Sequence, residues 1–111
     1  TPPFDARSRF YLNDGGWKFR DATDASGLAD AGYAMGAAVA DVDNDGDLDV
    51  FVSAYGKAHL FLNRGNAPFE DATAASGILA EGFLSSAGFA DLDGDGLVDL
   101  YVCNYLHYDQ V

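Results

Sequence analysis

The sequence predicts an all-β protein assembled from short antiparallel strands that repeat at a fixed interval. Two acidic segments, 41–49 and 91–99, share the spacing Asp-x-Asp-x-Asp-Gly-x-x-Asp and begin 50 residues apart. Each lies between a short apolar stretch and a run rich in β-branched and aromatic residues, which is typical of strands. No long segment has apolar residues at helical spacing. A period of this size, with several short strands per unit, predicts four-stranded β-propeller blades.

Four strands are expected in the complete middle unit, with the acidic segment as the first turn. They cover about residues 37–40, 48–54, 59–62 and 68–71. The third strand alternates, so that Leu60 and Leu62 would face one side of the sheet and Phe61 the other. Small residues on the first strand suit the crowded centre of a propeller. A polar connector over residues 73–82 leads to the next unit.

The repeat divides the chain into half a blade, a full blade and half a blade. Tyr11-Leu12-Asn13 recurs as Phe61-Leu62-Asn63, for example. The expected segments are 8–35, the second half of one blade with its connector; 36–85, a complete blade with its connector; and 86–111, the first half of a further blade. One unit cannot bury its faces alone. The expected partners are therefore neighbouring blades, either from a longer chain or from copies in a head-to-tail ring or filament.

The acidic segments predict two metal-binding loops. Four carboxylates at positions 1, 3, 5 and 9 of each loop would repel one another unless a cation lay between them. Oxygen ligands on a short, glycine-containing loop favour Ca²⁺ over Mg²⁺. The loops are not EF-hands, because position 12, where an EF-hand has a bidentate Glu, is Val52 or Val102.

The predicted ligands are the side-chain oxygens at positions 1, 3, 5 and 9 and the backbone carbonyl at position 7. The side chain at position 7 is expected to be a bystander, since the second loop has a leucine there. Two Ca²⁺ sites are predicted, formed by Asp41, Asp43, Asp45, Asp47 and Asp49 and by Asp91, Asp93, Asp95, Leu97 and Asp99.

Charge and composition limit the partners and the compartment. The formal net charge of −12 argues against nucleic acid and anionic membranes as partners, and no apolar run predicts membrane insertion. Nine of the 18 acidic residues lie in the two loops. Carboxylate-rich sites of this kind are usually filled where free calcium is on the order of millimolar. An extracellular, periplasmic or cell-surface location is therefore expected.

Taken together, these residues resemble the FG-GAP/VCBS repeat. The resemblance is carried by Ala-Asp-x-Asp-x-Asp-Gly-x-x-Asp, which begins at residues 40 and 90, and by Leu-Phe-Leu-Asn-x-Gly at 60–65. The run at 69–77 and the pair Asn104-Tyr105 are closest to the ASPIC/UnbV group, which includes the cartilage acidic proteins. The middle unit departs from this pattern, because it has Ala54 at the position of Asn104. The resemblance implies an integrin-α-like propeller with a calcium loop between the first two strands of a blade.

The expected function is a calcium-binding propeller module for extracellular protein interaction or self-assembly, in which calcium is structural. A protein or a glycan is the kind of ligand that its surface would meet. The alternative is a fragment of a propeller-type polysaccharide-active enzyme or a lectin. An enzyme is disfavoured because the sequence has no evident nucleophile–base set, and His59 and His107 are expected to be ordinary strand-end residues. Cys103, the single cysteine, is expected to be a small buried strand residue, with a disulfide to another segment or to a partner as the alternative.

Overall fold

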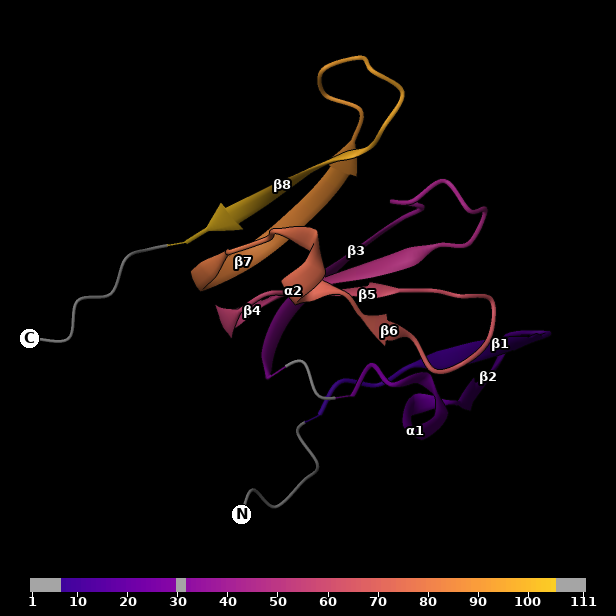
Figure 1. The fold of residues 1–111 in the computed structure, drawn as a ribbon. Coiled ribbons are helices and arrows are strands. Elements are labelled where there is room, and N and C mark those ends of the chain that lie inside the picture. Colours follow the sequence, from indigo (N-terminus) through magenta and orange to yellow (C-terminus); the bar gives the residue numbers. More distant parts are fainter. Residues whose placement is uncertain (1–6, 30–31, 106–111) are drawn as a thin grey trace, which may run out of the picture.

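The computed structural model describes residues 7–29 and 32–105, whose strands form antiparallel sheets (Figure 1). The strands are β1 (Tyr11–Gly15), β2 (Lys18–Asp21), β3 (Tyr33–Ala40), β4 (Asp49–Lys57), β5 (His59–Leu62), β6 (Glu70–Asp71), β7 (Glu81–Ala90) and β8 (Asp99–Asn104). Two four-residue helices, α1 (Thr23–Ser26) and α2 (Thr73–Ser76), lie in the connectors. The chain is therefore all-β, as predicted, with the antiparallel arrangement of a partial β-propeller.

The four strands predicted for the middle unit lie side by side. β4 pairs with β3 on one side and with β5 on the other, and β5 pairs with β6. β3 begins earlier than predicted, because its pairing with β4 continues past a bulge as far as Tyr33 opposite Tyr55. β6 is shorter than predicted. Pro68 has no N–H to donate to a ladder, and the N–H of Phe69 donates instead to the carbonyl of Ser26 at 2.8 Å.

The next hairpin, β7–β8, repeats the geometry of β3–β4. Its pairs run from Leu84 opposite Asn104 to Ala90 opposite Asp99, each 50 residues beyond its counterpart in the first hairpin. The bulge recurs at the same place, between Leu84 and Ser86. The sequence repeat is thus a structural repeat down to its irregularity. Residues 106–111 of the third predicted segment lie outside the described residues, and with them His107.

The two units meet at β3, β4 and β7. The end of β4 pairs with the start of β7, where Tyr55 lies opposite Phe83 and Lys57 opposite Glu81. At Gly36 on β3, a Cβ atom would lie 3.1 Å from the Ser53 hydroxyl and 3.4 Å from a carbonyl of β7. The small residues predicted for the first strand therefore permit this close approach.

The core lies on both faces of the β4–β5 pair. Val52 and Phe61 pack with Leu28 on one face. On the other face, Leu60 and Leu62 belong to a second cluster with Ala58, Leu84 and the fully buried Phe51. The predicted alternation of Leu60 and Leu62 against Phe61 is confirmed. Because each face of the β4–β5 pair packs against a different segment, these two strands are buried between neighbouring parts of the chain, as the inner strands of a propeller blade are.

Each connector contains one helical turn, which the sequence pattern does not predict. The carboxylates of Asp21 and Asp71 accept the N–H groups of Thr23 and Thr73 at 2.9 and 3.0 Å. Each turn then ends at a glycine in the left-handed region, such as Gly27 with a φ of 77°. In the part of the chain that the structure describes, neither helix has the length or apolar character needed to cross a membrane.

Candidate metal sites in the two acidic loops

The two acidic segments form the turns of the β3–β4 and β7–β8 hairpins, as predicted. We define the first loop as residues 41–49 and the second loop as residues 91–99. Both project from the same end of the strands (Figure 1). Positions 4 and 6 of each loop have positive φ angles, at Asn44 (58°), Gly46 (92°), Gly94 (79°) and Gly96 (88°). Glycine and asparagine adopt this conformation most readily, so the motif fixes the path of the backbone.

The first aspartate of each loop organises the turn. Asp41 accepts the N–H groups of Asp45 and Gly46 at 3.2 and 2.8 Å. Asp91 accepts the same pair 50 residues later, at 3.1 and 2.8 Å. The N–H of Gly46 lowers the pKa of Asp41, and the N–H of Gly96 lowers that of Asp91, because these bonds favour the charged carboxylate. Position 1 is therefore held ionised.

Three carboxylates converge in each loop. Oxygens of Asp41, Asp43 and Asp45 lie within 4.8 Å of one another, as do oxygens of Asp91, Asp93 and Asp99. The pKa of Asp43 is raised, mainly by desolvation and to a smaller extent by the nearby carboxylates of Asp45 and Asp49. Because all the donor atoms are oxygens and the carboxylates repel one another, each group fits a hard divalent cation.

The structure does not bring every predicted ligand into these groups. Asp49 is outside the first group and Asp95 is outside the second. Asp49 is fully buried at the start of β4, and its two oxygens accept the N–H groups of Val42 and Asn63, each at 2.8 Å. Asp99 is partly buried and accepts bonds from Leu92 and Asp93 of its own loop. In the first loop, position 9 therefore joins the loop to the following hairpin.

Position 7 differs in chemistry between the loops, as the sequence indicated. The backbone N–H of Asp47 donates to Asp45, and that of Leu97 donates to Asp95, each at 2.9 Å. The Leu97 side chain is exposed. The shared backbone geometry is compatible with an equivalent role for both residues, and ligation through their carbonyls stays a prediction.

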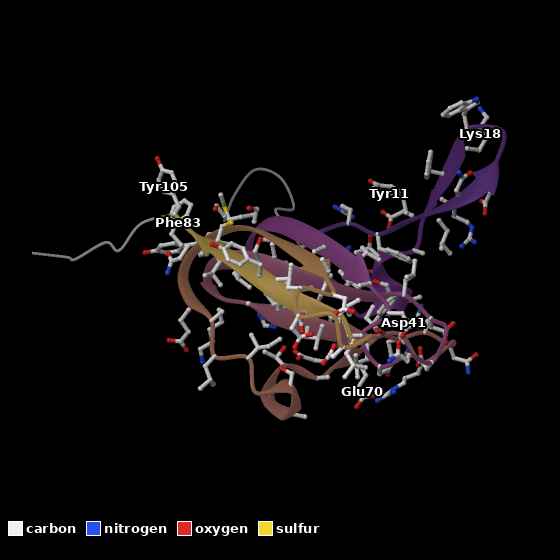
Figure 2. The ribbon with its side chains drawn as sticks, turned by 90° about the horizontal axis from the view of Figure 1, so that it is seen from above. Tyr11, Lys18, Asp41, Glu70, Phe83 and Tyr105 are labelled. Atoms are coloured by element: carbon white, nitrogen blue, oxygen red, sulfur yellow. The ribbon has the colours of Figure 1, made fainter. Side chains whose placement is uncertain are left out.

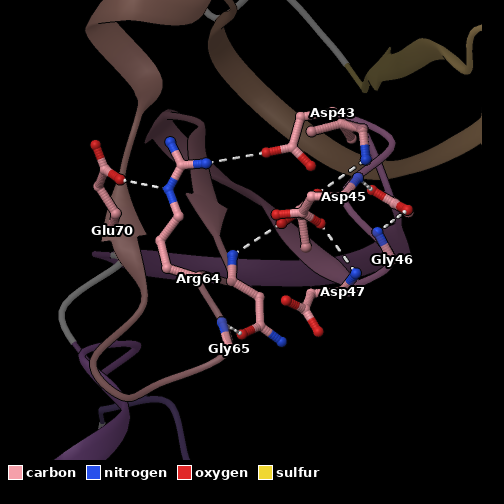
Figure 3. Close-up of polar contacts among 11 residues, drawn as sticks. Asp43, Asp45, Gly46, Asp47, Arg64, Gly65 and Glu70 are labelled. Carbon is pink, nitrogen blue, oxygen red and sulfur yellow. Dashed lines mark hydrogen bonds and ion pairs between the residues drawn. The ribbon is translucent and has the colours of Figure 1, made fainter.

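Sequence reasoning missed a basic residue beside the first loop. Arg64, in the turn after β5, extends between two carboxylates (Figure 3). Its Nη1 lies 3.1 Å from Asp43, and its Nε lies 2.8 Å from Glu70. The equivalent positions in the β1–β2 hairpin hold the reversed pair, in which Arg20 lies 3.2 Å from Asp14. This exchange of charge at a spacing of 50 residues is the sequence signal that could have identified Arg64.

A second polar pair lies in a surface cavity at the far end of the blade. The cavity has a volume of about 400 Å³ and includes Lys57, His59, Asp71 and Glu81 in its lining. His59 Nδ1 lies 3.5 Å from the Asp71 carboxylate, and its ring stacks on Phe61. The equivalent residues of the first unit, Arg9 and Asp21, also lie 3.5 Å apart. Because the first unit has Arg9 at the position of His59, the pair does not require a histidine, and this favours a structural role over catalysis.

Aromatic side chains form a row at the end of the sheets opposite the loops. Ring centroids are 6.4 Å apart for Tyr33 and Tyr55, 5.6 Å for Tyr55 and Phe83, and 5.4 Å for Phe83 and Tyr105. Figure 2 shows Phe83 and Tyr105 together, away from Asp41 and Glu70. The row joins the two units, and the three tyrosines are exposed.

Comparison with known proteins gave one family. The FG-GAP-like repeat matches residues 3–52 and again residues 41–102. The two matches together span most of the chain. The first includes β3, the first loop and the start of β4, and the second includes both loops, β7 and most of β8. No curated protein and no solved structure matches the chain.

Proposed function

The chain belongs to the FG-GAP-like repeat family, and from this premise we propose that it is a calcium-binding β-propeller module in which the ion is structural. One observation carries the proposal: two loops 50 residues apart share one hydrogen-bonded geometry and each brings three carboxylates together. Membership of the ASPIC/UnbV group is the finer part of the same proposal, supported by residues 69–77 and Asn104-Tyr105.

Calcium is favoured over other divalent ions by the donor set. The candidate ligands in both loops are oxygens, with no histidine or cysteine among them. Magnesium demands near-octahedral geometry and keeps several waters, whereas calcium accepts many carboxylate and carbonyl ligands in a flexible arrangement. Bound calcium would neutralise the converging carboxylates and hold the hairpin turn. Sites of this kind are usually filled where free calcium is on the order of millimolar, which supports an extracellular, periplasmic or cell-surface location.

Replacing Asp45 or Asp95 with alanine is expected to abolish one site each. Isothermal titration calorimetry should report a calcium stoichiometry that falls from two to one in either variant and to zero in the double variant. Each substitution removes one carboxylate but leaves the hydrogen bonds of Asp41 or Asp91 in place. Asp24→Ala is the matched control, because Asp24 is an exposed carboxylate outside both loops, and this variant should retain two sites. Two sites in Asp45→Ala or Asp95→Ala would contradict the ligand assignment.

The edge strand β8 suggests what the module contacts. In the described chain β8 pairs only with β7, whereas β4 pairs on both sides. Tyr101 on β8 is 66% exposed, while the equivalent Phe51 on β4 is fully buried. The β1–β2 hairpin, equivalent to β5–β6, forms a sheet of its own. We propose that a hairpin of this type, from a longer chain or from a copy of this one, covers β8.

Whether a copy of this chain covers β8 can be tested by measuring the self-association of the 111-residue chain. Multi-angle light scattering is expected to show a mass that rises with concentration, and Tyr101→Lys should reduce this rise because it places a charge on the apolar face. Leu79→Lys serves as the control, since Leu79 is 91% exposed and lies outside β8. A monomer at every concentration would show that copies do not cover β8.

An enzyme or a lectin is the second candidate. The cavity beside His59 and the exposed aromatic row are the features that such a function would use. The recurrence of the His59–Asp71 pair as Arg9–Asp21 favours a structural role over catalysis. We therefore propose a non-catalytic module whose aromatic row is available to a protein or glycan ligand.

A further inference from the structure

The turn after β5 closes over the first loop through two contacts. The backbone N–H of Asn63 donates to the Asp49 carboxylate at 2.8 Å. The guanidinium of Arg64 lies 3.1 Å from Asp43, a member of the converging group. The candidate site therefore includes a residue of the following hairpin that the nine-residue motif does not contain.

Arg64 places a permanent positive charge at the candidate cation site. An arginine side chain stays protonated at any pH at which the protein is folded. Glu70 holds the guanidinium from the other side at 2.8 Å, so its position between Asp43 and Glu70 is defined by two partners (Figure 3). Within residues 7–29 and 32–105, no arginine or lysine forms an ion pair with the second loop, so the two loops differ in this respect.

We infer that Arg64 sets the calcium affinity of the first loop by competing with the ion for Asp43; this inference rests on the proposed function. The guanidinium partly neutralises Asp43 in the ion-free loop and repels an incoming cation. Removing the charge leaves the three carboxylates of the group unchanged and strengthens their attraction for calcium. Glu70 offers Arg64 an alternative partner, so the arginine does not block the site completely.

The test compares arginine variants in a chain whose second loop has been disabled by Asp93→Ala and Asp95→Ala. In this background calorimetry reports the first loop alone. Arg64→Gln is expected to raise its calcium association constant about fivefold, as expected for one charge near a divalent ion in a solvated loop. Arg64→Lys, which keeps the charge, should bind calcium like the parent. Arg20→Gln is the matched control, because Arg20 pairs with Asp14 on the equivalent hairpin, and it should leave the association constant unchanged.

The salt dependence separates repulsion from a purely structural role. The Debye length falls from ~10 Å at 0.1 M salt to ~3 Å at 1 M. The ratio of the calcium association constant of Arg64→Gln to that of its parent should therefore approach one at high salt. A ratio that does not change with salt would overturn the inference. Equal or weaker binding by Arg64→Gln at low salt would also overturn the inference. Weaker binding would show instead that Arg64 positions Asp43 for the ion.

Failure of the proposed function gives a different result. If neither the parent nor Arg64→Gln binds calcium, both the proposed function and the inference are refuted. If the parent binds and Arg64→Gln binds with the same affinity, only the inference fails. Binding by Arg64→Gln where the parent shows none would support the competition directly.

Discussion

Replacing Asp49 with alanine is expected to destabilise the fold by about 2–5 kcal/mol, because the backbone N–H groups of Val42 and Asn63 would lose their acceptor. Asp49 is fully buried, and each of its two oxygens accepts one of these bonds at 2.8 Å. The bonds join β4, the first loop and the turn after β5. Urea denaturation in saturating calcium and again in excess chelator would measure the loss in both states of the loop.

The control for Asp49 is the same motif position in the second loop. Asp99 is only partly buried, and its bonds go to Leu92 and Asp93 within its own loop. Asp99→Ala should therefore cost less than Asp49→Ala. Asp49→Asn should fall between wild type and Asp49→Ala, since an amide oxygen can accept one of the two bonds. Equal losses for the two alanine variants would contradict the role given to Asp49.

Strands and loop positions could be predicted from local sequence. The alternation of Leu60, Phe61 and Leu62 places side chains on opposite faces whatever the neighbouring segments are. The motif places glycine or asparagine where the loop needs positive φ, so the turn conformation is encoded within a few residues. These features depend on short-range geometry, and the structure confirms them.

The features that were missed depend on packing or on side-chain hydrogen bonds. The start of β3 at Tyr33 depends on its partner Tyr55 on the next strand. The helical turns at Thr23 and Thr73 are fixed by bonds to Asp21 and Asp71, and four residues are too few to show an apolar period.

The candidate site was predicted in its motif residues but not in its surroundings. Arg64 lies 21 positions from Asp43 and reaches it only because the turn after β5 folds back over the loop. Asp49 looked like one more ligand, whereas its burial and its bond to Asn63 give it a structural role as well. Both observations require the arrangement of β4 beside β5, which a one-dimensional pattern does not contain.

Removal of calcium is expected to lower the melting temperature sharply. A ligand that binds only the folded chain stabilises it by about 2.7 kcal/mol per site at a hundredfold excess over Kd. Two sites would contribute about 5 kcal/mol. For a chain of this size that corresponds to a shift on the order of 20 °C. In the ion-free chain the carboxylates that converge in each loop repel one another, and relief of this repulsion is part of the free energy of calcium binding.

The most direct test of the account is the melting curve of the chain in calcium, in magnesium and in excess chelator, followed by circular dichroism. The Asp45→Ala/Asp95→Ala variant, measured under the same three conditions, controls for effects of the chelator that do not pass through the loops. We expect a melting temperature much higher in calcium than in chelator, an intermediate value in magnesium, and no calcium response in the double variant. The same melting temperature for the wild-type chain in calcium and in chelator would contradict the proposal that bound calcium holds the two loops.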